Sequence, residues 1–257
     1  MRLGTLTVTI LCGLTQAAAL AAPLHFCYED APQAPWTMPD GTGLNIELLK
    51  RVARLTGEEF TYHPRPWKRC QEETRTGHMD GMIGGADSPD RRNYSQPPLN
   101  QDGTANADKA LYHDHASVYI RAGSGASWDG RDLVNPRGVV AAQRGYYVAD
   151  ILQQRGQRVL DTVKSVEDGL RMVAAGMADV AVLQGRAAED LVHNDARFRD
   201  RIELAKTPYV TLPLYLHISR KLYERDPKRI EAIWSAIPVV RATPEFRKME
   251  AEARRED

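Results

Sequence analysis

The stretch from residue 60 to residue 84 reads FTYHPRPWKRCQEETRTGHMDGMIG and contains the order of elements that decides the fold class. Aromatic residues at its start indicate a strand. Pro66 then opens a helix that we predict over 67–76, and Gly77 ends it. The apolar residues of 79–84 indicate a second strand. A strand, a helix and a strand in this order predict parallel strands with the helix packed on one face of the sheet.

The same alternation begins closer to the N-terminus. Residues 24–28 indicate a first strand, and apolar residues recur at helical spacing from Ile46 towards Gly57. We expect Asn45 to cap this helix at its start. A loop rich in proline and glycine separates the strand from the helix. Residues 24–84 therefore predict a β-α-β-α-β order.

A second run of the same kind lies further along the chain. It predicts strands over 138–143, 159–163 and 180–183 and helices over 147–154 and 166–175. The two runs also share a turn, because Gly77-His78-Met79-Asp80 and Gly176-Met177-Ala178-Asp179 each precede an apolar strand. The repeated order predicts two lobes of similar construction.

The last segments determine how the lobes connect. A strand over 214–219 and helices over 227–240 and 244–253 have no strand–helix–strand unit of their own, so they must pack on an existing lobe. A chain that crosses twice between lobes produces a hinge and a cleft. We therefore predict an α/β protein with two lobes, each a mostly parallel sheet flanked by helices. Lobe one comprises 22–112 and 212–257, and lobe two comprises 113–211.

The N-terminus predicts export. Arg2 is the only charged residue before His25, residues 3–14 are mostly apolar, and small residues follow them. This order is typical of a signal peptide, and Ala19-Leu20-Ala21 places the cleavage after it. A membrane anchor is the alternative, but the apolar run is shorter than the ~20 residues that cross a bilayer. We predict a signal peptide over 1–21 and a soluble periplasmic protein.

Composition and cysteine usage narrow the function classes. The formal charge is +0 and 42% of the residues are hydrophobic, which argues against a nucleic-acid partner, a membrane-surface partner and disorder. Cys12 leaves with the signal peptide, so Cys27 and Cys70 remain. In an oxidising compartment two cysteines most simply form one disulfide. Metal or redox chemistry is the alternative, but there is no C-x-x-C motif, and two cysteines alone do not make a zinc site.

Two turns at predicted strand ends are candidate ligand-binding segments. Ser88 begins a helix with proline at its first position, so backbone N–H groups are free there, and Arg91 just behind can hold a carboxylate. A surface arginine in a charged turn is the alternative. In the second lobe Gly145, Tyr146 and Tyr147 follow a strand in the same way, so this turn can meet a ligand from the opposite wall.

Two further features have open interpretations. Trp67 lies in a proline-rich turn at the mouth of lobe one, where it can fill the core or contact a ligand, and we favour ligand contact. His113-Asp114-His115 is the only local cluster that resembles metal ligands, and a polar strand is the favoured interpretation. We expect no metal site and no cofactor.

The chain resembles the bacterial extracellular solute-binding proteins of family 3, the polar-amino-acid type of periplasmic binding protein, over about residues 24–249. The matching pieces are Ala34-Pro35-Trp36, Gly43–Leu48, Pro66–Cys70, Gly77–Gly81 and Ser88–Arg92. The resemblance implies the type II binding-protein fold, closure of two lobes around a solute, and an inner-membrane ABC permease as partner. We expect a monomer.

The resemblance also implies roles for single residues. Arg91 falls on the arginine that binds the ligand carboxylate, and Trp67 falls on a position that packs on the ligand. Asp30 falls in a first loop that contacts polar ligands. The segment Gly145-Tyr146-Tyr147 falls on the loop whose backbone meets the carboxylate.

Three positions depart from the family's pattern. Ala86 replaces a hydroxyl residue, and Tyr146 and Tyr147 replace small residues. Gln184 stands where amino-acid binders carry an aspartate that neutralises the ligand's ammonium. A buried ammonium needs a negative partner, so we expect a ligand other than an ordinary α-amino acid bound in the usual way. A carboxylate anchored by Arg91 or a larger polar solute suits these residues better.

The expected function is capture of a small polar or carboxylate-bearing solute in the periplasm for an ABC transporter, without catalysis. One alternative is an enzyme on the same fold, since some relatives of the resembled family are periplasmic dehydratases. Glu29, Asp30 or His193 would then supply an acid or a base. A sensory or assembly partner without transport is the other alternative.

Overall fold

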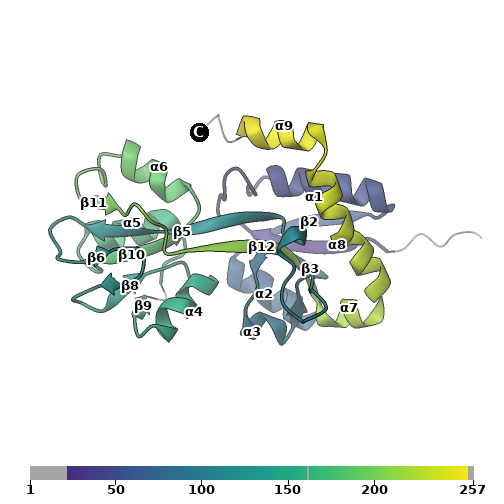
Figure 1. The fold of residues 1–257 in the computed structure, drawn as a ribbon, viewed down its shortest axis with the longest axis horizontal. Helices are drawn as coiled ribbons and strands as arrows, with labels where there is room; N and C mark the ends of the chain where they lie inside the picture. Colours follow the sequence, from purple (N-terminus) through teal and green to yellow (C-terminus); the bar gives the residue numbers. More distant parts are fainter. Residues whose placement is uncertain (1–21, 161, 254–257) are drawn as a thin grey trace, which may run out of the picture.

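The computed structural model describes residues 22–160 and 162–253, and Figure 1 shows two halves joined by two long strands. The first half contains β1 Leu24–Glu29, α1 Leu44–Thr56, β2 Phe60–Arg65, α2 Trp67–Thr76 and β3 Gly81–Ala86. Its three strands are parallel and lie in the order β2-β1-β3. This half therefore has the predicted strand–helix–strand order.

The second half repeats this architecture. It contains β8 Val139–Ala141, α4 Tyr147–Gln154, β9 Arg158–Leu160, α5 Val166–Ala174, β10 Val180–Gln184, α6 Ala187–Asn194 and β11 Ile202–Leu204. Strands β10, β8 and β9 are parallel and adjacent in this order. The two predicted lobes of the α/β fold are therefore present, and we call these halves lobe one and lobe two.

The connecting strands are β5 Tyr112–Arg121 and β12 Val210–Ser219, which run side by side between the lobes (Figure 1). They pair antiparallel with each other. Strand β12 also pairs with β3 of lobe one, and β5 also pairs with β10 of lobe two. Main-chain hydrogen bonding therefore continues from one lobe to the other through the connection.

Smaller elements complete the chain. They are α3 Pro89–Arg92, β4 Ser95–Gln96, the 3-10 turn η1 Ala107–Lys109, β6 Ser127–Trp128 and β7 Leu133–Val134. The C-terminal helices are α7 Arg220–Arg225, α8 Pro227–Arg241 and α9 Pro244–Ala253. Figure 1 shows that these helices return to lobe one, where α8 packs against α1.

Each lobe has its own buried apolar clusters. In lobe one, Trp234 of α8 lies in one cluster with Phe26 and Ile46, and its Nε1 donates to the carbonyl oxygen of Leu216 at 2.9 Å. In lobe two, Leu183 and Val182 are successive residues of β10 that belong to different clusters. A strand of a parallel sheet is buried on both faces, which explains its continuous apolar sequence. The lobe boundaries at residues 112 and 212 stay a prediction.

Local signals predicted most elements, with one error at a helix start. Helix α2 spans the predicted 67–76, and Gly77 ends it in a left-handed conformation with φ of 83°. Asn45 does not cap α1, which begins at Leu44 with Gly43 at the cap position. A Cβ on Gly43 would lie 2.5 Å from the carbonyl oxygen of Trp36, so the close approach of the preceding loop sets the start of this helix. Neither α6 nor β11 was predicted.

The predicted signal peptide, residues 1–21, lies outside the described residues. Across 22–160 and 162–253, no helix is both long enough and apolar enough to cross a bilayer.

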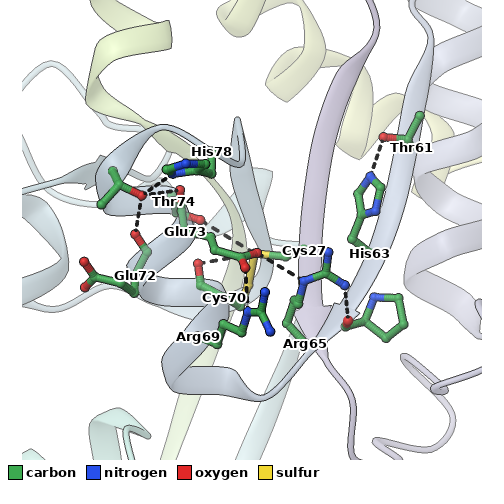
Figure 2. A network of polar contacts seen from close by, with 12 residues as sticks. Cys27, Thr61, His63, Arg65, Arg69, Cys70, Glu72, Glu73, Thr74 and His78 are labelled. Atoms are coloured by element: carbon green, nitrogen blue, oxygen red, sulfur yellow. Dashed lines mark hydrogen bonds and ion pairs between the residues drawn. A yellow bond between two sulfur atoms is a disulfide. The ribbon is translucent and has the colours of Figure 1, made fainter.

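A disulfide joins Cys27 of β1 to Cys70 of α2, as the sequence predicted, and both residues are fully buried. Figure 2 shows Glu73 beside this bond, between Arg65 and Arg69. Its carboxylate lies 3.1 Å from Nε of Arg65 and 2.6 Å from Nε of Arg69. Helix α2 is therefore attached to β1 by the disulfide and to the end of β2 by an ion pair.

Candidate solute-binding cleft

A cavity lies between the lobes beside the start of β5. Five residues predicted from the sequence line it: Trp67, Arg91, Tyr146, Tyr147 and Gln184. Glu29, Gln33 and Tyr112 also line it. Both lobes contribute, so the cavity is a cleft of the kind that the fold prediction requires.

The end of β3 is shaped by two glycines. The pairing of β3 with β12 slips at Gly84, which is the extra residue of a β-bulge. Gly84 has a φ of 83°, which glycine adopts without strain. A Cβ on Gly85 would lie 2.8 Å from the ring of His217, so this position has no room for a side chain. The bulge turns the end of β3 so that Gly84 lines the cavity.

Arg91 is the cation of the cleft and is 4% exposed. The hydroxyl of Ser88 accepts a hydrogen bond from the backbone N–H of Arg91 at 3.3 Å and so caps α3. Nη1 of Arg91 donates to the carbonyl oxygen of Ala86 at 2.6 Å, and Nη2 donates to that of Gly145 at 3.0 Å. The guanidinium also lies 5.5 Å from the ring centroid of Trp67. Burial lowers the pKa of the Arg91 guanidinium, but arginine stays charged in proteins.

Two more side chains of lobe one donate to the same carbonyl oxygen of Gly145. Nε1 of Trp67 lies 3.1 Å from it and Nε2 of Gln71 lies 2.9 Å from it. Helix α2 places these two donors on one face because they are four residues apart. We call the convergence of Arg91, Trp67 and Gln71 on this oxygen the Gly145 contact. Gln71 was not predicted from the sequence, although its spacing from Trp67 was a usable signal.

The two tyrosines of lobe two fill much of the cleft. The hydroxyl of Tyr146 accepts a hydrogen bond from Nε2 of Gln33 at 3.0 Å, which is another link between the lobes. The rings of Tyr146 and Trp67 meet edge to face with centroids 6.3 Å apart. Tyr147 begins α4 and packs against the apolar cluster of lobe one. Bulk at these positions therefore closes the space that small residues would leave open.

A carboxyl pair lies at the end of β1. Glu29 lines the cavity, whereas its neighbour Asp30 is exposed and does not line it. Burial is the main cause that raises the pKa of Glu29 to about 8, and the charge of Asp30 and a hydrogen bond to it raise the pKa further. Backbone N–H groups of Trp67 and Ala31 act in the opposite direction. Glu29 is therefore a carboxyl that holds its proton near neutral pH. The ligand-binding role of Asp30 stays a prediction.

Gln184 closes the opposite side of the cleft. It ends β10, is 7% exposed, and its backbone N–H donates to Oε1 of Gln143 at 2.9 Å. Its side chain hydrogen-bonds to Asp114 of β5, a carboxyl whose pKa is raised chiefly by burial. A buried carboxyl therefore lies behind the neutral amide. Sequence reasoning had placed Asp114 only in a metal-like cluster.

His217 supports Arg91 from behind. It is fully buried in β12, and its Nδ1 lies 3.2 Å from the hydroxyl of Ser95, which donates to the carbonyl oxygen of Arg91 at 3.1 Å. Burial is the main cause that lowers the pKa of His217 to about 3, and the charge of Arg91 lowers it further. The imidazole is therefore neutral at pH 7 and adds no charge to that of Arg91.

The space inside the cleft is small. The cavity has a volume of about 30 Å³, enough for water but much less than an amino acid or organic acid needs. A second, more polar hollow of about 370 Å³ is lined by Ser88, Gly145 and Asp150. Arg91 and Tyr147 line both spaces and so form the partition between them. The Gly145 contact thus lies at the boundary of the larger hollow.

Other candidates lie away from the cleft. Nε2 of His115 lies 3.0 Å from Oε1 of Glu189, while His113 is exposed. Within the described part of the chain no group of three His, Cys, Asp or Glu side chains could hold a metal ion. His193 is exposed on α6 and does not line the cavity, so it is not an acid or base of this cleft.

Comparison with known proteins supports the fold. A scan against family models and a search of curated proteins found no match. Solved structures do match. A histidine kinase sensor domain with similarity to periplasmic binding proteins has a TM-score of 0.68 at 17% identity, over 89% of this chain and 95% of that chain.

Two other solved structures are similar over 90% of this chain and 94% of theirs. One is AbpA from Streptococcus pneumoniae, an amino acid ABC transporter substrate-binding protein bound to L-arginine, with a TM-score of 0.65 at 16% identity. The other is an ancestral amino acid-binding protein, a precursor of cyclohexadienyl dehydratase, with a TM-score of 0.64 at 18% identity. The predicted two-lobed α/β fold of periplasmic binding proteins is therefore confirmed.

Proposed function

We propose that this protein is an exported, monomeric binding protein that captures a small polar or carboxylate-bearing solute between its lobes for an ABC permease. The observation that carries the proposal is the buried guanidinium of Arg91. Its guanidinium donates to the neutral carbonyls of Ala86 and Gly145 and hydrogen-bonds to Tyr94, while the carboxylates of Asp90 and Asp150 act on it through charge alone. A buried charge without a directly bonded counter-ion is costly, so this site favours an anion. The fold supports the proposal, since other proteins with this fold bind amino acids.

The chemistry of the cleft narrows the solute class. Gln184 offers an amide, and Glu29 is protonated near neutral pH because burial raises its pKa to about 8. An organic acid needs only Arg91 as its charged partner. An amino-acid-like solute would also need a charged carboxylate beside its ammonium, and Glu29 would have to lose its proton to supply one.

A thermal-shift screen of the mature protein against amino acids, organic acids and polyamines tests the proposal. A true solute at 100 times its Kd stabilises the folded state by about 2.7 kcal/mol. We expect at least one organic acid to raise the melting temperature of wild type but not that of Arg91→Ala. The proposal is contradicted if no compound raises the melting temperature of wild type more than that of Arg91→Ala.

Glu29 gives a second candidate function, an enzyme on the same fold, specific support. A carboxyl with a pKa near 8 in a cleft can act as a general acid. Incubation of the protein with each screening hit, followed by NMR of the small molecule, separates the two functions. Unchanged solute supports binding, whereas turnover that Glu29→Gln abolishes supports catalysis. A sensory role is the remaining alternative, and a matching permease that restores uptake would exclude it.

A further inference from the structure

The Gly145 contact joins the lobes through a single oxygen atom. Its donors are Nη2 of Arg91, Nε1 of Trp67 and Nε2 of Gln71, at 3.0, 3.1 and 2.9 Å. All three belong to lobe one, and the acceptor belongs to the turn before α4 in lobe two. A carbonyl oxygen has two lone pairs, so it receives more donors here than it has lone pairs to pair with them.

A carboxylate matches this donor set better than a carbonyl does. Its two oxygens offer about four lone-pair sites, and its negative charge would bond directly to Arg91, on which Asp90 and Asp150 act only through charge. We propose that Arg91, Trp67 and Gln71 form an oxyanion subsite that the protein's own Gly145 carbonyl occupies when the cleft is closed. A carboxylate-bearing solute takes the place of this carbonyl. Binding at this point therefore separates the walls of the cleft instead of drawing them together.

Other contacts in the cleft also hold its two walls together without a solute. The hydrogen bond from Gln33 to Tyr146 and the edge-to-face contact of Tyr146 with Trp67 link the same two walls. The remaining cavity of about 30 Å³ admits no organic acid. Arg91 and Gln71 also line the larger hollow but Trp67 does not, so a solute can reach all three donors together only after the Gly145 turn has moved away from them.

The backbone of the turn suits this role. Gly145 has a φ of 81°, which presents its carbonyl to lobe one and which other residues adopt only with strain. The side chain of Lys68 lies against it, because a Cβ on Gly145 would meet Cε of Lys68 at 2.7 Å. The backbone conformation of the turn thus presents the Gly145 carbonyl oxygen to donors of α2 and α3, and the side chain of Lys68 covers the turn.

Distances between spin labels test the closure without any solute. Leu55 in lobe one and Met177 in lobe two are exposed and can be changed to cysteine for labelling, while the two cysteines of the mature protein are buried in their disulfide. The protein is unfolded and refolded first to remove any solute from its expression host. We expect a narrow distribution of distances in the parent protein and a shift to longer distances in Gln71→Met.

Gln71→Met keeps the length of the side chain but removes the donor. Trp67→Phe removes the second donor independently, and Gln153→Met is the matched control, because Gln153 is an exposed glutamine of α4. Near-UV circular dichroism verifies that each variant is folded. The proposal is overturned if the label distances in the parent protein are as long as those in Gln71→Met. It is also overturned if Gln71→Met and Trp67→Phe both show the same label distances as the parent protein.

Acetate tests the oxyanion subsite itself, with acetamide as a neutral control of the same shape and chloride to match ionic strength. We expect acetate alone to lengthen the distances in the parent protein. If neither compound changes them, the three donors are not an oxyanion subsite. The inference rests on the proposed function only for its solute. A thermal-shift screen without hits would therefore contradict solute capture. It would not contradict closure by the Gly145 carbonyl, which the label distances of the refolded protein test separately.

Discussion

The two walls of the cleft have the same strand–turn–helix construction but different chemistry. Lobe one presents donors from Arg91, Trp67 and Gln71, whereas lobe two presents the carbonyl of Gly145 and the hydroxyl of Tyr146. The wall of lobe one is braced by a disulfide and by buried side chains. The wall of lobe two depends on the backbone conformation of one glycine. The comparison shows that a repeated topology leaves the chemistry of each strand end free to differ.

The largest expected effect comes from removing the covalent brace of lobe one. We expect Cys27→Ser with Cys70→Ser to lose about 4 kcal/mol of unfolding free energy, because the disulfide closes a long loop in the unfolded chain. Its sequence separation is 43 residues. Urea denaturation measures the loss, and wild type unfolded with a reductant is the control. A loss below ~1 kcal/mol would show that the brace contributes little.

The next effect is on affinity. Arg91→Ala should cost about 2–5 kcal/mol in binding of a screening hit, because it removes the charged partner of a buried anion. Calorimetry measures this as a loss of about thirtyfold to several thousandfold. Arg92→Ala is the matched control, since Arg92 is paired with Asp87 and more exposed. Equal losses of affinity in the two variants would show that Arg91 does not bind the solute.

Glu29 predicts a dependence of stability on pH. The pKa of Glu29 is about 8 in the folded protein and ~4.3 in the unfolded chain. Its contribution to the free energy of unfolding is therefore complete below pH ~4.3 and is lost as the pH rises to about 8. His217 has the opposite sign, because its folded pKa is about 3 and its unfolded pKa is ~6.5, so its contribution is lost as pH falls through this range.

The interval from pH 6.5 to 8 therefore lies above the titration range of His217 and includes that of Glu29. Stability should fall there by at most about 1.4 kcal/mol per pH unit. We expect Glu29→Gln to lack this slope in urea denaturation at several pH values. A variant with the same slope as wild type would show that another group is responsible.

The smallest expected effect tests the wall of lobe two. Gly145→Ala should lose about 1–2 kcal/mol of unfolding free energy, because alanine is strained in a left-handed conformation. Gly125 has a φ of 76°, and a Cβ there would have nothing within 4 Å, so Gly125→Ala measures the same strain alone. Lys68 can swing aside, so we expect the two losses to be similar. A Gly145→Ala protein as stable as wild type would show that the turn does not hold this conformation.

Much of the fold could be predicted because its signals are local. Pro66 and Gly77 fixed the limits of α2, since proline suits a helix start and glycine a helix end. The start of α1 could not be found in this way. It depends on the contact of Gly43 with the backbone of Trp36, which is tertiary packing.

The candidate site was less predictable for the same reason. Glu29 and Asp30 are neighbours, and a shift of one residue decides which side chain faces the cleft. Ser88 was predicted to begin a helix with free N–H groups, but α3 is a single turn and the Ser88 hydroxyl accepts one of them. Each donor to the Gly145 carbonyl lies more than 50 residues from Gly145 in the sequence, so only the folded chain brings donor and acceptor together.

The return of the C-terminus to lobe one has a consequence for how the protein is made. The core of lobe one needs Trp234 of α8, and strand β3 needs β12 as its neighbour. Lobe two is continuous in sequence from β5 to β11 and can begin to fold as soon as it has emerged. The part of the chain that is synthesised first is thus completed last. A chain stopped before α8 would carry β1 and α1 with their apolar faces uncovered, which exposes it to proteases and aggregation until synthesis ends.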